Sequence, residues 1–139
     1  MTTAVAFGTF DLFHPGHIAF LKEARQLCDR LVVIVAKDAV VLHYKHRLPV
    51  RNEQTRLADV ALCEFVDEAV LGDSLEDQGA FNVLAHLKPD LVTLGYDQEE
   101  LKNALKSHEV FRNTLKTVTL DPFNPDIYKT SLLRRDDSV

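Results

Sequence analysis

The chain has 139 residues, of which 46% are hydrophobic and 27% charged, and its formal net charge at pH 7 is −5. This length suits one domain with a single core, and the acidic balance argues against a nucleic-acid partner, because binding to a phosphate backbone requires clustered Lys and Arg. The sequence has no apolar run of about 18 residues for a membrane span, no basic region typical of a signal peptide and too few cysteines for a disulfide framework. We therefore expect a cytoplasmic protein with no membrane partner.

The first part of the chain predicts a strand, a helix and a second strand. Residues 3–7 are an apolar run, residues 17–29 place apolar side chains at helical spacing, and residues 31–36 are continuously apolar and β-branched, as in a parallel strand covered on both faces. Such a unit is a right-handed crossover, which brings residues 8–17 to the carboxyl edge of the sheet, where ligands bind in open α/β folds. Residues 37–49 have mixed periodicity and high positive charge, and we interpret them as a mobile, ligand-facing connection.

The rest of the chain continues the alternation. Further helices are predicted over residues 55–63, 76–87 and 98–108, further strands over residues 65–71, 91–95 and 118–120, and a last short helix from residue 129. We therefore predict one α/β domain over residues 1–139: a Rossmann-like, doubly wound, mostly parallel five-stranded sheet with helices on both faces.

The loop after the first strand holds the most informative residues. Gly8 lets the backbone turn tightly, and Pro15-Gly16 lead into a helix that begins near His17. A helix N-terminus presents unpaired N–H groups and a partial positive charge, and the imidazoles of His14 and His17, one turn apart, can donate hydrogen bonds to phosphate oxygens. The loop therefore predicts a phosphate site.

Gly-Thr-Phe-Asp at residues 8–11, followed by His-Pro-Gly-His at residues 14–17, resembles the signature of the cytidylyltransferase-like nucleotidyltransferase superfamily. This resemblance implies an enzyme that joins a nucleoside monophosphate from a nucleoside triphosphate to a phosphate-bearing acceptor and releases pyrophosphate. It implies that His14 and His17 are catalytic, because in this superfamily they contact triphosphate oxygens and stabilise charge as the α-phosphorus becomes five-coordinate. A divalent cation, Mg²⁺, is the implied cofactor, and its ligands stay open.

The resemblance and the strand ends together predict the nucleotide-binding residues. Lys45 would neutralise the β- and γ-phosphates, Asp97 lies across the switch point from the first loop, where base and ribose would sit, and Thr130-Ser131 stand where the superfamily carries a phosphate-binding helix start. The full predicted set is Gly8, Thr9, Phe10, His14, Gly16, His17, Lys45, Gly95, Asp97, Thr130 and Ser131.

Three charged residues are predicted to contact the acceptor. Asp11 and Asp38 follow the first and second strands, where they would orient the acceptor or bind magnesium, and Arg56 on the next helix would reach the site. An alternative for both carboxylates stays open, because short acidic side chains at strand ends often cap turns.

Three further segments resemble the archaeal-type FAD synthases, which are FMN adenylyltransferases. They are LVVIVAKD at residues 31–38, VDEAVLG at residues 66–72 and LKPDLVTLGYDQ at residues 87–98. This resemblance implies ATP and FMN as small-molecule substrates and FAD as product, and small members of the superfamily are often homodimers. Two alternatives stay open: a CTP-dependent glycerol-3-phosphate cytidylyltransferase, whose typical Arg-Thr-Glu-Gly-Ile-Ser-Thr-Thr run is missing here, and a nucleotide-binding module without catalysis.

Overall fold

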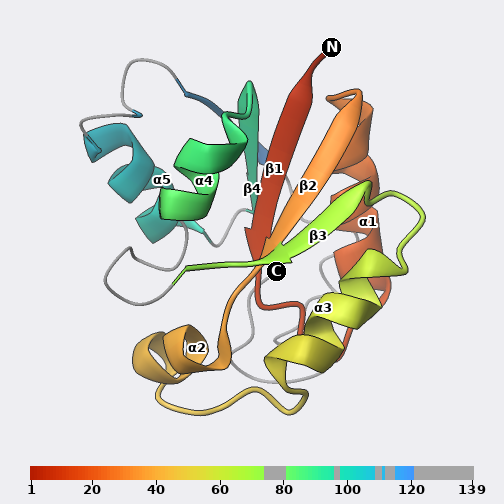
Figure 1. Ribbon diagram of the computed structural model, residues 1–139, viewed down its shortest axis with the longest axis vertical. Helices are drawn as coiled ribbons and strands as arrows, with labels where there is room; N and C mark the ends of the chain where they lie inside the picture. Colours follow the sequence, from red (N-terminus) through yellow and green to blue (C-terminus); the bar gives the residue numbers. More distant parts are fainter. Residues whose placement is uncertain (74–80, 96–97, 109–110, 112–114, 121–139) are drawn as a thin grey trace.

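The computed structural model (Figure 1) describes residues 1–73, 81–95, 98–108, 111 and 115–120. Within these ranges the strands form one parallel five-stranded sheet in the order β3-β2-β1-β4-β5, which confirms the predicted α/β, Rossmann-like fold and makes it wholly parallel. None of the helices described there is long and apolar enough to cross a membrane. The elements are β1 (Thr3–Gly8), α1 (Pro15–Gln26), β2 (Arg30–Val35), α2 (Asp38–Lys45), α3 (Glu53–Ala61), β3 (Glu68–Leu71), α4 (Phe81–Leu87), β4 (Leu91–Gly95), α5 (Glu99–Ser107) and β5 (Lys116–Leu120).

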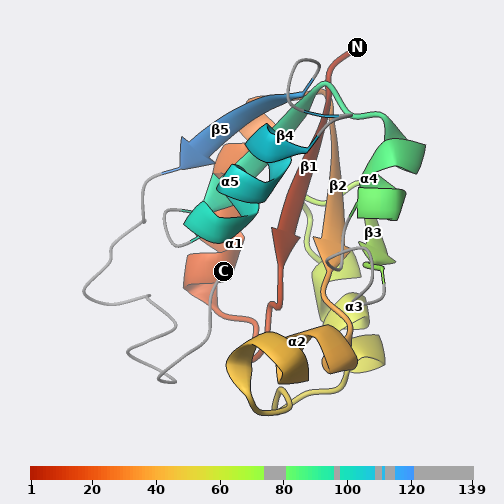
Figure 2. The same cartoon turned by 90° about the vertical axis from the view of Figure 1, so that its left-hand side faces the viewer.

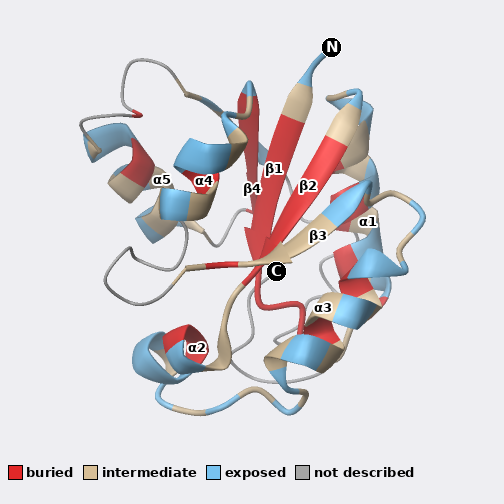
Figure 3. Ribbon diagram, in the orientation of Figure 1, coloured by how far each residue is buried: buried red, intermediate tan, exposed pale blue. Residues whose placement is uncertain are grey.

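The sheet divides the core into two apolar layers. From β1, Ala4 and Ala6 face the side covered by α1 and α3, whereas Val5 and Phe7 face the side covered by α4 and α5. Figure 2 shows α4 and α5 in front of the sheet with α1 and α3 behind it, and Figure 3 shows burial concentrated on the central strands. Because both faces of β1 and β2 are covered, their sequences are continuously apolar, which is the signal that predicted them.

Residues 37–49, interpreted from the sequence as a mobile, ligand-facing connection with no helix, contain the helix α2 over residues 38–45. This short helix turns only Val40 and Val41 into the core and ends at His46, whose backbone is left-handed with φ of 63°. Two inward apolar residues in eight are too few to set up a readable helical period. The α2 helix lies beyond the carboxyl end of β2, below the strand tips in Figure 1, so this region faces the expected ligand edge.

A buried arginine fastens the connections at this carboxyl edge. Arg56 of α3 is fully buried, and its guanidinium donates to the carbonyl oxygens of Thr9 (2.8 Å) and Arg51 (3.0 Å) and to Oδ1 of Asp38 (2.8 Å). One side chain therefore ties together the loop after β1, the loop before α3 and the first residue of α2.

A buried carboxylate fastens the same region with the opposite charge. Asp11 is fully buried, its Oδ2 accepts the N–H of Val50 (2.8 Å), and its Oδ1 accepts the N–H groups of Arg51 (3.0 Å) and Leu12 (3.1 Å). Asp11 and Arg56 thus both bond to the backbone of Arg51, and together they fix the loop after β1 against the connection that leads into α3.

We expect Arg56→Ala to lower the free energy of unfolding by about 3 kcal/mol or more, because it leaves two carbonyl groups and the Asp38 carboxylate without their donor. Urea denaturation followed by circular dichroism measures this loss. The matched control is Arg30→Ala, which removes an exposed ion pair with Glu68 and should cost less than about 1 kcal/mol. Equal, small losses in both variants would contradict the assigned role of Arg56.

Candidate active site

The two histidines of the first loop cap helix α1 reciprocally. His14 is the N-cap residue, and its Nδ1 accepts the N–H of Gly16 at 3.0 Å, while Nδ1 of His17 accepts the N–H of His14 at 3.3 Å. This is a capping box made by imidazoles, and it satisfies two N–H groups that the first helical turn otherwise leaves unpaired. The cap also explains why α1 begins at Pro15 rather than near residue 17, since proline at the first helical position loses no hydrogen bond.

The caps determine which ring nitrogen carries the proton. An Nδ1 atom that accepts a hydrogen bond bears no proton, so the neutral ring of each histidine is protonated at Nε2. Burial lowers the pKa of His14, and burial, followed by the positive charges of His14 and Lys45, lowers the pKa of His17 to about 3. At neutral pH both residues therefore carry their proton on Nε2 of an uncharged ring.

Aromatic contacts hold His17 in place. Its fully buried ring stacks on the ring of His14, with centroids 3.8 Å apart, and on that of Phe13, with centroids 5.6 Å apart, and it meets the edge of Phe10 at 5.5 Å. Phe10 and Leu12 adopt left-handed backbone conformations, with φ of 53° and 51°, which cost about 1 kcal/mol or more each for non-glycine residues. The complete burial of Phe10 offsets that cost and fixes the loop that carries the histidines.

The charge of Lys45 acts on His17 although the two residues lie far apart in the sequence. Lys45 ends α2, and its charge contributes to the lowered pKa of His17, which places its ammonium group in the electrostatic environment of that ring. A helix N-terminus, two imidazole N–H donors and a lysine near one strand end form a surrounding suited to an anion.

The three residues predicted to contact the acceptor, Asp11, Asp38 and Arg56, all bond to other segments at the carboxyl edge of the sheet. The Asp11 carboxylate and the Asp38 carboxylate bond to neighbouring segments of the protein, and Arg56 is fully buried among three of them. These bonds give both carboxylates the turn-holding role that the sequence left open as an alternative, and contact with an acceptor stays a prediction for all three residues.

The remaining predicted nucleotide contacts are placed only in part. Gly8 and Gly95 end β1 and β4 at the carboxyl edge, and the carbonyl of buried Thr9 accepts from the guanidinium of Arg56. The predicted residues Asp97, Thr130 and Ser131 lie outside the described residues. Within the described ranges, no three His, Cys, Asp or Glu side chains gather as a metal site would require.

The strands β1 and β4 diverge next to the histidine loop. They pair only from Ala4 to Ala6 of β1. The chain leads from β1 to β2 and β3 on one side and then crosses to β4 on the other, so this is the switch point where ligands bind in open α/β sheets. Gln98 bridges the diverging ends: its Nε2 donates to the carbonyl oxygen of Phe7 (2.9 Å), and its Oε1 accepts the N–H of Gly95 (2.8 Å).

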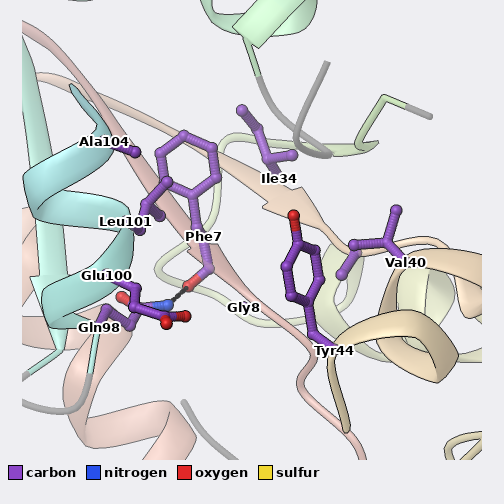
Figure 4. Close-up of a pocket in the computed structure, with 10 residues that line it drawn as sticks. Phe7, Gly8, Ile34, Val40, Tyr44, Gln98, Glu100, Leu101 and Ala104 are labelled. Carbon is purple, nitrogen blue, oxygen red and sulfur yellow. Dashed lines mark hydrogen bonds between the residues drawn. The ribbon is translucent and has the colours of Figure 1, made fainter. Parts of the chain in front are cut away.

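A pocket of about 460 Å³ opens beside this point, at the carboxyl ends of β1 and β2 (Figure 4). Phe7 and Ile34 of the strands contribute to its lining, together with Val40 and Tyr44 of α2 and Leu101 of α5. Sequence reasoning missed this pocket because it treated α2 as a loop. The spacing of four residues between Val40 and Tyr44, which puts both on one side of a helix, is the signal that was available.

Comparisons with known proteins agree with this geometry. A family model described as "Cytidylyltransferase-like" matches residues 5–135. The chain is 48% identical over 98 residues to an FAD synthase of Methanosarcina barkeri, covering 70% of this chain and 67% of that protein, and 42% identical over 120 residues to an FAD synthase of Archaeoglobus fulgidus, covering 81% and 84%. In three such relatives the matched region spans 60%, 64% and 67% of the relative's own length.

A solved structure is also similar over nearly the whole fold. It is a protein of Thermoplasma volcanium described as a lipopolysaccharide core biosynthesis protein, with a TM-score of 0.78, 34% identity and coverage of 89% of this chain and 99% of that one. The family model and these relatives lead to one conclusion: the chain belongs to the cytidylyltransferase-like family.

Proposed function

We propose that this chain is an FMN adenylyltransferase, an FAD synthase, which transfers the adenylyl group of ATP to the phosphate of FMN and releases pyrophosphate. The observation that carries the proposal is the reciprocal imidazole cap at the N-terminus of α1, which leaves the proton of both rings on Nε2, while the charge of Lys45 acts on His17. The similarity to relatives named FAD synthase, 42% to 48% identical, selects ATP and FMN among the substrates of the family.

The reaction needs positioning and charge stabilisation more than acid–base chemistry. A phosphate oxygen of FMN attacks the α-phosphorus of ATP in line with the departing pyrophosphate; the new P–O bond forms as the α–β phosphoanhydride bond breaks. The FMN phosphate is already an anion at pH 7, so no side chain has to remove a proton from it. The pyrophosphate leaves with the bonding electron pair, and donors beside it stabilise the charge that develops there.

His14 and His17 would supply these donors to triphosphate oxygens. Because each Nδ1 receives a backbone N–H, the ring is polarised and its Nε2–H becomes a stronger donor, as hydrogen bonds in a chain reinforce one another. The ammonium group of Lys45 would add positive charge toward the β- and γ-phosphates, and Gly8, Phe10 and Gly16 would let the nucleotide approach the backbone. Thr9, Gly95, Asp97, Thr130 and Ser131 stay proposed nucleotide contacts.

A divalent cation would be held at this site mainly by the phosphate oxygens of the substrate. Mg²⁺ binds proteins through few carboxylates and keeps most contacts to phosphate oxygens and water, which suits a described region without a cluster of three protein ligands. When bound to the triphosphate, the cation supplies further neutralisation of charge. We propose no protein ligand for it. Both substrates are small molecules, and a homodimer is the assembly we propose for the chain.

The first prediction concerns the substrates. The purified protein with ATP, FMN and Mg²⁺ should release pyrophosphate and form FAD in equal amounts, measured by a coupled pyrophosphate assay and by chromatography of the flavin. Faster turnover of CTP with glycerol 3-phosphate would replace the proposal with a cytidylyltransferase. Nucleotide binding without pyrophosphate release, over a broad panel of phosphorylated acceptors, would identify a binding module.

The second prediction concerns the histidine pair. His17→Ala should lower kcat for FAD formation by about 100-fold or more, because it removes a preorganised donor from the developing charge. The matched control is His86→Ala, an exposed histidine on α4, which should leave kcat unchanged. Loss of the cap alone costs on the order of 1 kcal/mol of stability, so a denaturation curve shows whether the variant is folded in the assay. Unchanged turnover of folded His17→Ala would contradict its catalytic role.

The third prediction concerns the protonation state of His17. The pKa of this residue is lowered from 6.5 to about 3 in the folded protein, so below pH 6.5 the unfolded chain binds a proton that the folded chain does not. Stability from this group is therefore lost as pH falls, by about 2 kcal/mol between pH 7 and pH 5.

Urea denaturation at the two pH values tests this. The wild-type protein should lose about 2 kcal/mol more than His17→Asn, which cannot titrate, whereas His86→Asn should follow the wild type. Equal losses in the wild type and His17→Asn would show that His17 is not held neutral by the fold.

A further inference from the structure

We propose that the pocket between α2 and α5 binds the ring system of the acceptor, a flat aromatic heterocycle, and that Tyr44 stacks on it. This inference rests on the proposed function, in which the heterocycle is the isoalloxazine of FMN. The pocket adjoins the proposed phosphate site, because its lining includes Gly8, the last residue of β1, and the histidine loop follows directly after Gly8. An acceptor with its ring in the pocket therefore has its phosphate near the histidines.

The shape of the pocket suits a flat ring. Figure 4 shows Phe7, Leu101 and Ala104 on one side of the space and Tyr44 and Val40 on the other, so that an inserted ring would lie between two apolar walls. The volume of about 460 Å³ falls within the range of roughly 300–1,000 Å³ that is usual for pockets holding organic ligands. A tricyclic ring uses this volume more fully than a bicyclic purine does.

The charges of the pocket exclude its use as a phosphate site. Among the described residues, those that line the pocket include the carboxylate of Glu100 but no Lys, Arg or His, so an anionic group is repelled rather than attracted there. The amide of Gln98 is already bonded to the carbonyl of Phe7 and the N–H of Gly95. The occupant is therefore apolar over most of its surface, with an N–H group able to face a carboxylate, as the isoalloxazine has.

Tyr44 lines the pocket with an exposed aromatic ring that a ligand can cover. Its side chain is large and aromatic, yet 52% of the residue is exposed. Its ring meets the ring of His43 edge-on, with centroids 4.9 Å apart. A ligand ring that covers this face removes apolar surface from water and gains aromatic stacking, which preferentially selects flat heterocycles.

The position relative to the strands favours the acceptor over the base of ATP. In doubly wound sheets the nucleotide lies at the switch point, which here is the divergence of β1 and β4 bridged by Gln98. The pocket begins beside this point, at Gln98 and α5, and extends over the ends of β1 and β2 to Val40 and Tyr44 of α2 (Figure 4). A ring stacked on Tyr44 occupies the α2 end, which separates the two ring systems and lets their phosphates meet at the histidine loop, as an in-line transfer requires.

Steady-state kinetics with two pairs of variants test this proposal. Tyr44→Leu should raise KM for FMN about tenfold, the amount expected for loss of one stacking aromatic ring, while leaving KM for ATP within about twofold of the wild type. Tyr44→Phe should keep KM for FMN within about twofold, since the ring is retained. Ala104→Phe should fill the pocket and raise KM for FMN at least as much, whereas Ala61→Phe, an exposed position on α3, should change neither constant.

Direct binding separates this proposal from the proposed function. FMN fluorescence is titrated with each protein in the absence of ATP, so that affinity is measured without turnover. Tyr44-dependent binding of FMN by a protein that forms no FAD would uphold the pocket and overturn the proposed function. FAD formation with the same KM for FMN in Tyr44→Leu and in the wild type would overturn the pocket and uphold the function. A rise in KM for ATP alone would assign the pocket to adenine and overturn the proposal.

Discussion

The reciprocal cap between His14 and His17 is the interaction on which the site depends. Each ring uses Nδ1 to complete the backbone of α1, and this use fixes the ring's orientation and its tautomer, while burial lowers the pKa of both rings and keeps them uncharged at neutral pH. A serine or threonine cap would satisfy the same N–H groups, but it has no second nitrogen that could donate away from the helix as Nε2 does. In this helix the capping residues are also the side chains that we propose as phosphate donors, so a substitution of either one changes both the start of α1 and the candidate site.

Buried polar residues hold the loop that carries this cap in a fixed position relative to the ends of the other strands. Arg56 and Asp11 are both fully buried, and they tie the histidine loop to α2 and to the connection before α3. Gln98 holds the ends of β1 and β4 on the opposite side. Polar groups thus do at the carboxyl edge what apolar packing does inside the sheet, which is to set distances between segments that have no regular pairing.

The sequence predicted the elements that carry a strong pattern. The apolar runs of β1 and β2 and the amphipathic stretch of α1 stand out because burial of both sheet faces requires them. The start of α1 was missed by two residues, since histidine is not a preferred N-cap residue, and α2 was missed because it buries only two side chains. The buried position of Arg56 has no signal in the sequence, because arginine is mostly exposed and its partners are carbonyl groups of distant segments.

The cap also opposes ligation of a metal ion by the histidine pair. A neutral imidazole that ligates Zn²⁺ through Nε2 must carry its proton on Nδ1, and here Nδ1 of both rings accepts a backbone N–H. Such ligation would therefore break both hydrogen bonds that begin α1. The helix thus disfavours zinc at this pair of histidines, although elsewhere their spacing of three residues belongs to zinc sites.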